Sequence, residues 1–339
     1  MLNEDPDAEG PIAEDPKVTA IKERLLAIPQ IAQWPEMAAV VRSGRRNKAS
    51  IPCWEYPILS CEAVGGDAAE AMPGMVATVC LLNSIHLIDD MLDDDPEGLY
   101  HELGSGAVAN IAAAFQAAAI QALAEVDLPS DRLTALYQAV GRGGLATAHG
   151  QYIDSSPFEG DPEEAYWRAA LGKTPPLFGA AFFMGAVLGG ADLETASRLE
   201  GLALHVGKII QAGDDMGDAL EVPPDTDWTT RWNNLVILYA LVADHPDKAR
   251  FVELADRHHE PEALAEAQEI LVRSGAISYG CYHVIDGYRR GRDALAALDL
   301  PHPERFGRLF EELIEPARQL FANLGIEPPD ELYYTLGET

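Results

Sequence analysis

The sequence predicts an all-α fold, on the evidence of its composition, its lack of strand patterns and the spacing of its turn residues. Ala, Leu, Glu and Met dominate, β-branched residues are scattered, and no Asn-Gly hairpin occurs. Gly- and Pro-rich breaks divide the chain into helix-length segments; they lie at residues 65–67, 95–98, 127–131, 155–162, 189–190, 222–227 and 299–301. No repeat and no long polar linker separates these segments, so we expect one helical domain over residues 18–339.

The N-terminal residues and the charge balance set limits on location and partners. Residues 1–17 are acidic and Pro-rich and lack a signal-peptide pattern, which predicts a disordered tail and no export. The four cysteines form no Cys-x-x-Cys pair, as expected of reduced thiols in a cytoplasmic protein. The net charge of -31 repels nucleic acid and anionic membranes, which excludes both as partners. It also repels a free diphosphate, so such a substrate requires bridging metal ions.

Two apolar stretches, residues 106–123 and 174–191, are long enough to raise the question of a membrane span. The first is mostly Ala, and the second is interrupted by Gly and opens with two prolines. Neither has a flanking basic cluster or aromatic belt. We therefore expect buried helices rather than a stable membrane span.

Two acidic clusters with the pattern D-D-x-x-D dominate the functional interpretation. They occupy residues 89–93 and 214–218. Residues four apart lie on one face of an α-helix, so Asp89 pairs with Asp93, and Asp214 with Asp218. Paired carboxylates are hard oxygen ligands suited to Mg²⁺, which completes its coordination with water and phosphate oxygens. Two such pairs facing one another would hold a metal cluster around a diphosphate.

The residues beside the clusters suit a hydrocarbon attached to that diphosphate. Ile85 and Leu82 lie on the Asp89/Asp93 face, one and two turns earlier in an apolar run, and would form an apolar wall beneath the metal. Gln211 lies on the same side as Asp214 and Asp218, where Lys208 is the single basic residue. A solvated helix face usually interleaves lysines with its acids, so this face is unusual for plain surface.

Further motifs accompany the two clusters in a fixed order. They are Ala63 to Asp67, G-Q-x-x-D at Gly150 to Asp154, E-x-Y at Glu164 to Tyr166, K-T-x-x-L-F at Lys173 to Phe178, and Gln211 three residues before Asp214. The ordered set resembles the trans-isoprenyl diphosphate synthases (polyprenyl synthetases), a branch of the class I isoprenoid synthases, over roughly residues 40–330.

The resemblance implies an all-α bundle with a deep central cavity, a homodimer, and Mg²⁺ as the metal, with about three ions bound. It implies metal ligation by Asp89, Asp93, Asp214 and Asp218, supported by Asp90 and Asp215. Lys173 would contact the diphosphate, and the substrate would meet Gln211, Gln151, Phe178, Ile85 and Leu82.

Three departures from the family pattern concern basic residues. In the family's G-K-x-x-R-P motif, Lys48 is kept but Ile51 replaces the arginine. The arginine pair expected after the first cluster is missing from residues 96–102, and the later G-K-x-T is replaced, with Arg231 as a candidate second clamp. Each lost contact to a phosphate is worth roughly 1.5–3 kcal/mol. Three losses would weaken binding of isopentenyl diphosphate by about three to six powers of ten.

These departures favour a single-substrate terpene cyclase that ionises an allylic diphosphate of fifteen to twenty carbons or longer. The alternative is a chain-elongating prenyltransferase in which shifted residues such as Arg42, Arg45, Arg46 and Lys48 hold isopentenyl diphosphate. A third interpretation, a non-catalytic subunit, fits poorly because both Asp clusters are present.

Overall fold

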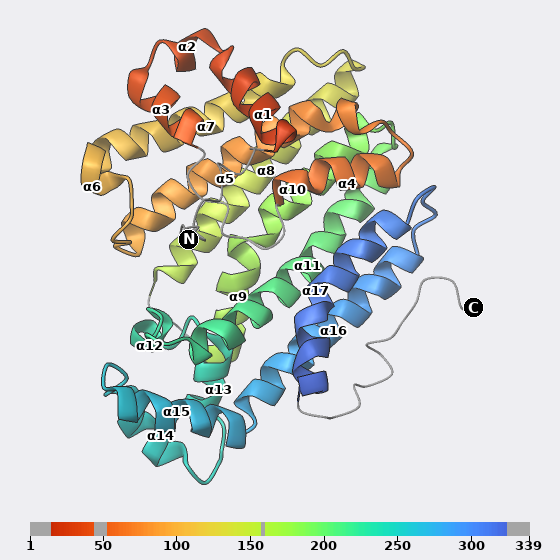
Figure 1. Cartoon of the computed structure of the whole chain (residues 1–339). Coiled ribbons are helices and arrows are strands. Elements are labelled where there is room, and N and C mark those ends of the chain that lie inside the picture. Colours follow the sequence, from red (N-terminus) through yellow and green to blue (C-terminus); the bar gives the residue numbers. More distant parts are fainter. Residues whose placement is uncertain (1–14, 44–52, 157–159, 324–339) are drawn as a thin grey trace, which may run out of the picture. The chain divides into compact units, whose positions relative to one another are not determined.

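The structure, a computed structural model, describes residues 15–43, 53–156 and 160–323 (Figure 1). Within these ranges the regular elements are helices, with no strand, which confirms the all-α prediction. Lys48 and most of the acidic tail expected over residues 1–17 lie outside the described residues. Asp15 caps the first helix by accepting a hydrogen bond from the Lys17 backbone N–H at 2.7 Å.

The pattern of contacts within the chain divides it into two compact units, and the boundary lies between Pro52 and Cys53. In the first unit, short helices pack on one another through side chains such as Ile21 and Met37. A proline at the first turn starts each of them, where its missing N–H costs nothing. They are α1 (Pro16–Leu26), α2 (Pro29–Ala32) and α3 (Pro35–Ser43).

The second unit carries the predicted functional residues. Its elements are η1 (Cys53–Glu55), α4 (Tyr56–Ala63), η2 (Ala68–Ala71), α5 (Met72–Leu92), α6 (Tyr100–Leu103), α7 (Ser105–Leu123), α8 (Ser130–Asp154), α9 (Pro162–Lys173), α10 (Pro175–Leu188), α11 (Leu193–Leu220), α12 (Asp227–Thr230), α13 (Leu235–Val242), α14 (Lys248–Ala255), α15 (Pro261–Arg273), α16 (Ala276–Ala296) and α17 (Glu304–Asn323).

Helix α10 is the central element of this unit. It packs against α4, α8 and α11 and is buried on nearly all sides (Figure 1). Its sequence is apolar all round, as expected of a helix without a solvent face. Helices α8 and α11 both pack on α10 and are joined directly by the Arg142–Glu200 ion pair, so motif residues from distant parts of the sequence lie on neighbouring helices.

By length and composition alone, three helical stretches of the described chain could cross a membrane: Ala68–Leu92, Ser105–Leu123 and Pro162–Leu188. Much of each apolar window, 56%, 39% and 72% respectively, is buried inside the protein. Packing against neighbouring helices accounts for the apolar character of the first and third. That the chain has no membrane span stays a prediction.

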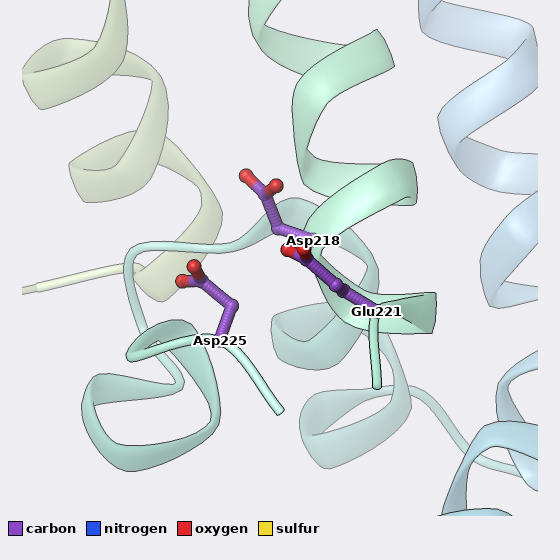
Figure 2. A group of neighbouring side chains, drawn as sticks. All are labelled: Asp218, Glu221 and Asp225. Atoms are coloured by element: carbon purple, nitrogen blue, oxygen red, sulfur yellow. The ribbon is translucent and has the colours of Figure 1, made fainter. Parts of the chain in front are cut away.

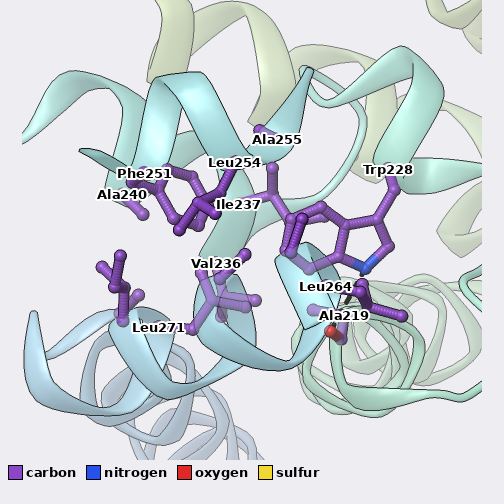
Figure 3. Close-up of a cluster of buried hydrophobic side chains, with 14 residues drawn as sticks. Ala219, Trp228, Val236, Ile237, Ala240, Phe251, Leu254, Ala255, Leu264 and Leu271 are labelled. Atoms are coloured by element: carbon purple, nitrogen blue, oxygen red, sulfur yellow. Dashed lines mark hydrogen bonds between the residues drawn. The ribbon is translucent and has the colours of Figure 1, made fainter. Parts of the chain in front are cut away.

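A separate hydrophobic cluster lies beyond the end of α11, among α12 to α15 (Figure 3). The fully buried Trp228 lies in it, and the indole N–H donates to the Ala219 carbonyl at 3.2 Å. Phe251 of α14 packs near the Trp228 ring, with centroids 6.0 Å apart. This cluster fixes the short helix α12 against the end of the helix that carries the second acidic motif.

Candidate active site

The first acidic cluster lies where α5 ends. Asp89 occupies the last turn, and Asp93 is the C-cap residue. The Asp89 carboxylate accepts a hydrogen bond from Gln151 Nε2 at 2.5 Å and forms an ion pair with Lys173 Nζ at 3.0 Å. The structure therefore brings together three residues that the sequence assigned to the site, from α5, α8 and α9.

Lys173 ends α9 and connects two motifs. Besides Asp89, its ammonium pairs with Asp154 at 3.3 Å, so the D of G-Q-x-x-D joins the first cluster. Burial opposes the charge of Lys173, but the neighbouring Asp89 and Asp154 carboxylates outweigh it and raise the lysine pKa. Lys173 is thus a fixed positive charge at the acidic end of α5.

A close approach of α8 and α9 places this lysine. A Cβ built on Gly150 would lie 2.1 Å from the Gly172 carbonyl carbon and 2.4 Å from the Lys173 backbone nitrogen. No larger residue fits without separating the two helices. The glycine of G-Q-x-x-D is therefore explained by helix packing next to the site.

In the second cluster, the three aspartates of α11 differ in their surroundings. Asp214 is exposed and Asp218 half-buried, whereas Asp215 is only 1% exposed. Asp215 accepts hydrogen bonds from the Tyr166 hydroxyl at 2.5 Å, the Leu235 backbone N–H at 2.6 Å and Gln211 Nε2 at 2.8 Å. Both its oxygens are thus used inside the protein, so Asp214 and Asp218 are the carboxylates of this motif available to a metal.

Further acidic residues join the second cluster after α11 ends. Carboxylate oxygens of Asp218, Glu221 and Asp225 lie within 4.8 Å of one another (Figure 2). Asp227, at the start of α12, accepts a hydrogen bond from Asn234 Nδ2 at 2.9 Å. The sequence analysis missed these three additional acids, although their concentration in one short segment after D-D-x-x-D was a visible signal.

Asp227 also connects the two clusters electrostatically. Its pKa is raised to about 6, first by burial and then by the charges of Asp225 and Asp154, while Asn234 and Lys173 act in the opposite direction. Asp154 and Lys173 belong to the first cluster. Charges from both motifs therefore act on one another, as a shared metal–diphosphate site requires.

The donor set fits a hard divalent cation. Asp93 and Asp214 are exposed by surface area, but the protein atoms around their carboxylates remove part of the hydration, and this desolvation raises both pKa values to about 6. Desolvation of the half-buried Asp218 raises its pKa to about 7, and neighbouring carboxylates raise the pKa further at Asp93 and Asp218. These groups lose solvation and repel one another without a counter-ion. Carboxylate oxygens are the ligands that Mg²⁺ prefers, and Mg²⁺ would relieve that cost.

These shifts predict an unusual pH dependence of stability. The native pKa values exceed the ordinary value of about 3.9, so the native state binds extra protons between about pH 4 and pH 7. The free energy of unfolding therefore falls as pH rises through that window. We expect the Tm of metal-free protein to be at least about 2 °C higher at pH 5.5 than at pH 7.5, measured by scanning calorimetry. Mg²⁺ should raise Tm more at pH 7.5, where the ligands are ionised.

The control for this prediction is Asp218→Asn, which removes one titrating ligand. It should flatten the pH dependence and reduce the response to Mg²⁺. A wild-type Tm that rises from pH 5.5 to pH 7.5 without metal would contradict the assignment.

Arg231 does not lie as a clamp on this site. Its guanidinium pairs with Asp256 at 2.7 Å and also donates to the backbone carbonyls of Ala255 and Trp228. Arg231 has a φ angle of 62°, a backbone conformation that residues other than glycine rarely adopt. Of the two tryptophans whose role the sequence left open, Trp228 is core and Trp232 is 42% exposed.

The residues expected to form an apolar wall have mixed positions. Phe178 is buried in α10, edge-to-face with Tyr56 at 5.1 Å between ring centroids. Leu82 is buried in α5, and Ile85 is half-buried nearer the acidic end. Phe178 and Leu82 therefore contribute to the core around α5 and α10, and Ile85 is the more accessible of the three.

In the segment after the first cluster, where the arginine pair of the family is missing, Asp94 and Asp95 make contacts that hold the Tyr100 and His101 side chains. The Tyr100 hydroxyl donates to Asp94 Oδ1 at 2.8 Å, and His101 Nε2 lies 3.1 Å from the Asp95 carbonyl. Glu97 and Glu102 are both exposed. The structure thus gives this segment acidic rather than basic character beside the site.

Comparisons with known proteins agree with this arrangement. Residues 44–271 match the family model described as polyprenyl synthetase. A short chain isoprenyl diphosphate synthase of Methanothermobacter thermautotrophicus is 29% identical over 259 residues, which cover 71% of this chain and 78% of that protein. A geranylgeranyl diphosphate synthase of Methanosarcina mazei is 26% identical over 254 residues, 71% of this chain and 77% of the relative.

Solved structures show the same fold. The geranylgeranyl pyrophosphate synthetase of Pyrococcus horikoshii superposes with a TM-score of 0.74 at 21% identity, covering 88% of this chain and 96% of that one. A polyprenyl synthetase of Streptomyces coelicolor gives a TM-score of 0.72 at 22% identity, covering 87% and 99%.

Proposed function

The chain belongs to the polyprenyl synthetase family, and from that premise we propose that it is a trans-prenyl diphosphate synthase, which joins an allylic prenyl diphosphate to isopentenyl diphosphate with release of diphosphate. This proposal reverses the order of the two functions drawn from the sequence, where cyclisation came first. The relatives described above are named as isoprenyl and geranylgeranyl diphosphate synthases, which favours prenyl transfer. A substrate of fifteen carbons or more is part of the proposal.

The observation that carries the proposal is the ion pair of Lys173 with Asp89, which joins the cation to the first acidic motif. Mg²⁺ would be held by Asp89, Asp93, Asp214 and Asp218 and would supply Lewis-acid stabilisation of the leaving diphosphate. The Lys173 ammonium has three N–H donors and can turn one toward a phosphate oxygen while Asp89 and Asp154 keep it in place. Gln151 orients the Asp89 carboxylate through its hydrogen bond.

Terpene cyclisation remains a second candidate because of specific observations around the acceptor side. Residues 96–102 contain two glutamates and no arginine. Arg231 is bound to Asp256 and to backbone carbonyls. Of the residues that would replace the missing clamps, Arg45, Arg46 and Lys48 lie outside the described residues, and Arg42 is exposed near the end of α3.

Product analysis separates the two functions. The full chain is incubated with Mg²⁺ and geranylgeranyl diphosphate, with and without isopentenyl diphosphate, and products are identified by gas chromatography and mass spectrometry after dephosphorylation. We expect a longer prenyl diphosphate only when both substrates are present. Shorter allylic diphosphates are tested in parallel to determine which chain length the enzyme accepts.

A matched control is Lys48→Ala. Because Lys48 would hold isopentenyl diphosphate, its loss should raise the KM for that substrate at least tenfold and leave the KM for the allylic substrate within about twofold, since one charged contact is worth roughly 1.5–3 kcal/mol. A hydrocarbon or terpene alcohol formed from the allylic substrate alone would refute elongation and support cyclisation.

We also propose that the chain is a homodimer and is cytoplasmic. Exposed apolar side chains on α7 and α8 support self-association: Ile120, Leu145 and Tyr152 are 50%, 77% and 71% exposed. Light scattering after size-exclusion chromatography should give twice the mass of 36.6 kDa. Leu145→Glu should shift the protein toward the monomer, and a wild-type monomer at micromolar concentration would contradict the proposal.

A further inference from the structure

Asn234, between α12 and α13, is a buried polar residue beside the second acidic motif. It is 0% exposed, and it lies in the stretch of residues 227–235 where the sequence departs from the G-K-x-T pattern. The Asn234 amide uses its full hydrogen-bonding capacity: the oxygen accepts twice and the nitrogen donates twice. A buried amide whose bonds are all made is held in one orientation.

The oxygen of this amide caps helix α13. Asn234 Oδ1 accepts hydrogen bonds from the backbone N–H groups of Val236 and Ile237 at 3.1 and 3.2 Å. The Asn234 backbone is extended, with φ -125° and ψ 121°, as is usual for the residue that precedes a helix. Serine, threonine or aspartate can make the same cap, so capping alone does not explain an amide at this position.

The nitrogen of the amide connects α12 to α11. Asn234 Nδ2 donates to the Asp215 backbone carbonyl at 2.9 Å and to Asp227 Oδ2 at 2.9 Å. A hydroxyl has one hydrogen to donate, so serine or threonine cannot supply both bonds. Within the described residues no second donor binds the Asp227 carboxylate. Asn234 therefore sets the position of that carboxylate relative to the α11 backbone.

The Asp227 side chain is half-buried between the two acidic clusters. Its charge interacts with Asp225, which follows the second motif, and also with Asp154 and Lys173 of the first cluster. Repulsion from the neighbouring carboxylates would push Asp227 away from the site if it were not held. A neutral amide holds the carboxylate in place without cancelling its charge, which leaves that charge available to a metal–diphosphate complex.

We propose that Asn234 is a positioning residue of the active site, which holds the Asp227 carboxylate at a fixed place beside the metal ligands Asp214 and Asp218. This inference rests on the proposed function, because it assigns Asp227 to the metal–diphosphate site. A set of charges that is fixed before binding loses less conformational freedom when the ligand arrives. Loss of the Asn234 amide should therefore weaken metal binding even though Asp214 and Asp218 remain.

The test is a titration of the full chain with Mn²⁺ in the presence of inorganic diphosphate, with free Mn²⁺ measured by electron paramagnetic resonance. Mn²⁺ replaces Mg²⁺ as the probe because both prefer oxygen ligands. Asn234→Thr keeps an oxygen to cap α13 but cannot make both donor contacts, and should raise the Kd for Mn²⁺ at least about fivefold. Asn110→Thr is the matched control and should leave the Kd unchanged, because the exposed Asn110 amide donates only to Gly106 of its own helix, at 2.7 Å.

A double-mutant cycle separates positioning from simple structural support. Asp227→Asn removes the charge and should itself raise the Kd. In that background Asn234→Thr should add less than about twofold, because no charge remains to be positioned, whereas the Tm should fall in both backgrounds. Equal losses of Mn²⁺ affinity in the two backgrounds, or an unchanged Kd in folded Asn234→Thr, would overturn the inference alone. A wild type that binds no Mn²⁺ with diphosphate would overturn the proposed function, and this inference with it.

Discussion

Asp89→Asn is expected to lower kcat for the allylic diphosphate by at least about a hundredfold. The substitution removes the proposed metal ligand and also the carboxylate that pairs with Lys173 at 3.0 Å. Stabilisation of a leaving group by a metal is worth several kcal/mol, and each 1.36 kcal/mol is tenfold in rate. Release of diphosphate under saturating Mg²⁺ and substrate measures the effect directly.

The neighbouring Asp94→Asn is the matched control. Asp94 is exposed and accepts a hydrogen bond from the Tyr100 hydroxyl at 2.8 Å. Asp94 lies outside the proposed metal-binding pair Asp89 and Asp93, so kcat should stay within about threefold of wild type, as for an ordinary surface substitution. Equal losses in the two variants would show that the general acidity of this segment matters rather than the Asp89 position.

Gly150→Ala is expected to damage both stability and turnover. Its methyl group would overlap the backbone atoms of Gly172 and Lys173. Backbone atoms cannot move aside as the end of a flexible side chain can. Overpacking of this kind costs about 1–3 kcal/mol or more. A displacement of Lys173 by about 1 Å would lower kcat by around a hundredfold. Urea unfolding and steady-state kinetics measure the two effects.

Gly141→Ala provides the comparison within the same helix. A Cβ built on Gly141 meets no other atom within 4 Å, so this alanine should stabilise the protein by about 0.4–1 kcal/mol through the unfolded state. If Gly150→Ala retained wild-type stability and kcat, the close approach of α8 and α9 would not be what positions Lys173.

Composition, the lack of strand patterns and the spacing of turn residues were sufficient to predict the helical class, and the two acidic motifs are visible in the sequence itself. The alignment of Asp89 with Asp93, or of Asp214 with Asp218, depends only on helix geometry, because the partners are four residues apart. The ordered motifs predicted that Lys173 belongs to the site. The structure adds the physical reason, which is that Asp89 and Asp154 form ion pairs with its ammonium.

Contacts between residues far apart in the chain decided the remaining roles. The sequence predicts Asp215 to support metal binding beside Asp214, but Tyr166, 49 residues earlier, and Leu235, 20 residues later, bind Asp215 inside the protein. The sequence allowed Arg231 to be a clamp on the diphosphate, but its guanidinium is bound by Asp256, 25 residues later. Periodicity also carries no signal for α10, because a helix buried all round has no polar face.

The Trp228 anchor makes the connection after the second acidic motif a convenient place for a reporter group. The connection is held at one end by the indole bond to Ala219 and at the other by Asn234, which caps α13. Between these points the Val222 side chain is 73% exposed and is not a member of the buried cluster around Trp228. A fluorophore attached at Val222→Cys would therefore be held on a segment that is fixed at both ends, a few residues from Asp218. Its emission would report metal binding at the second acidic cluster in real time.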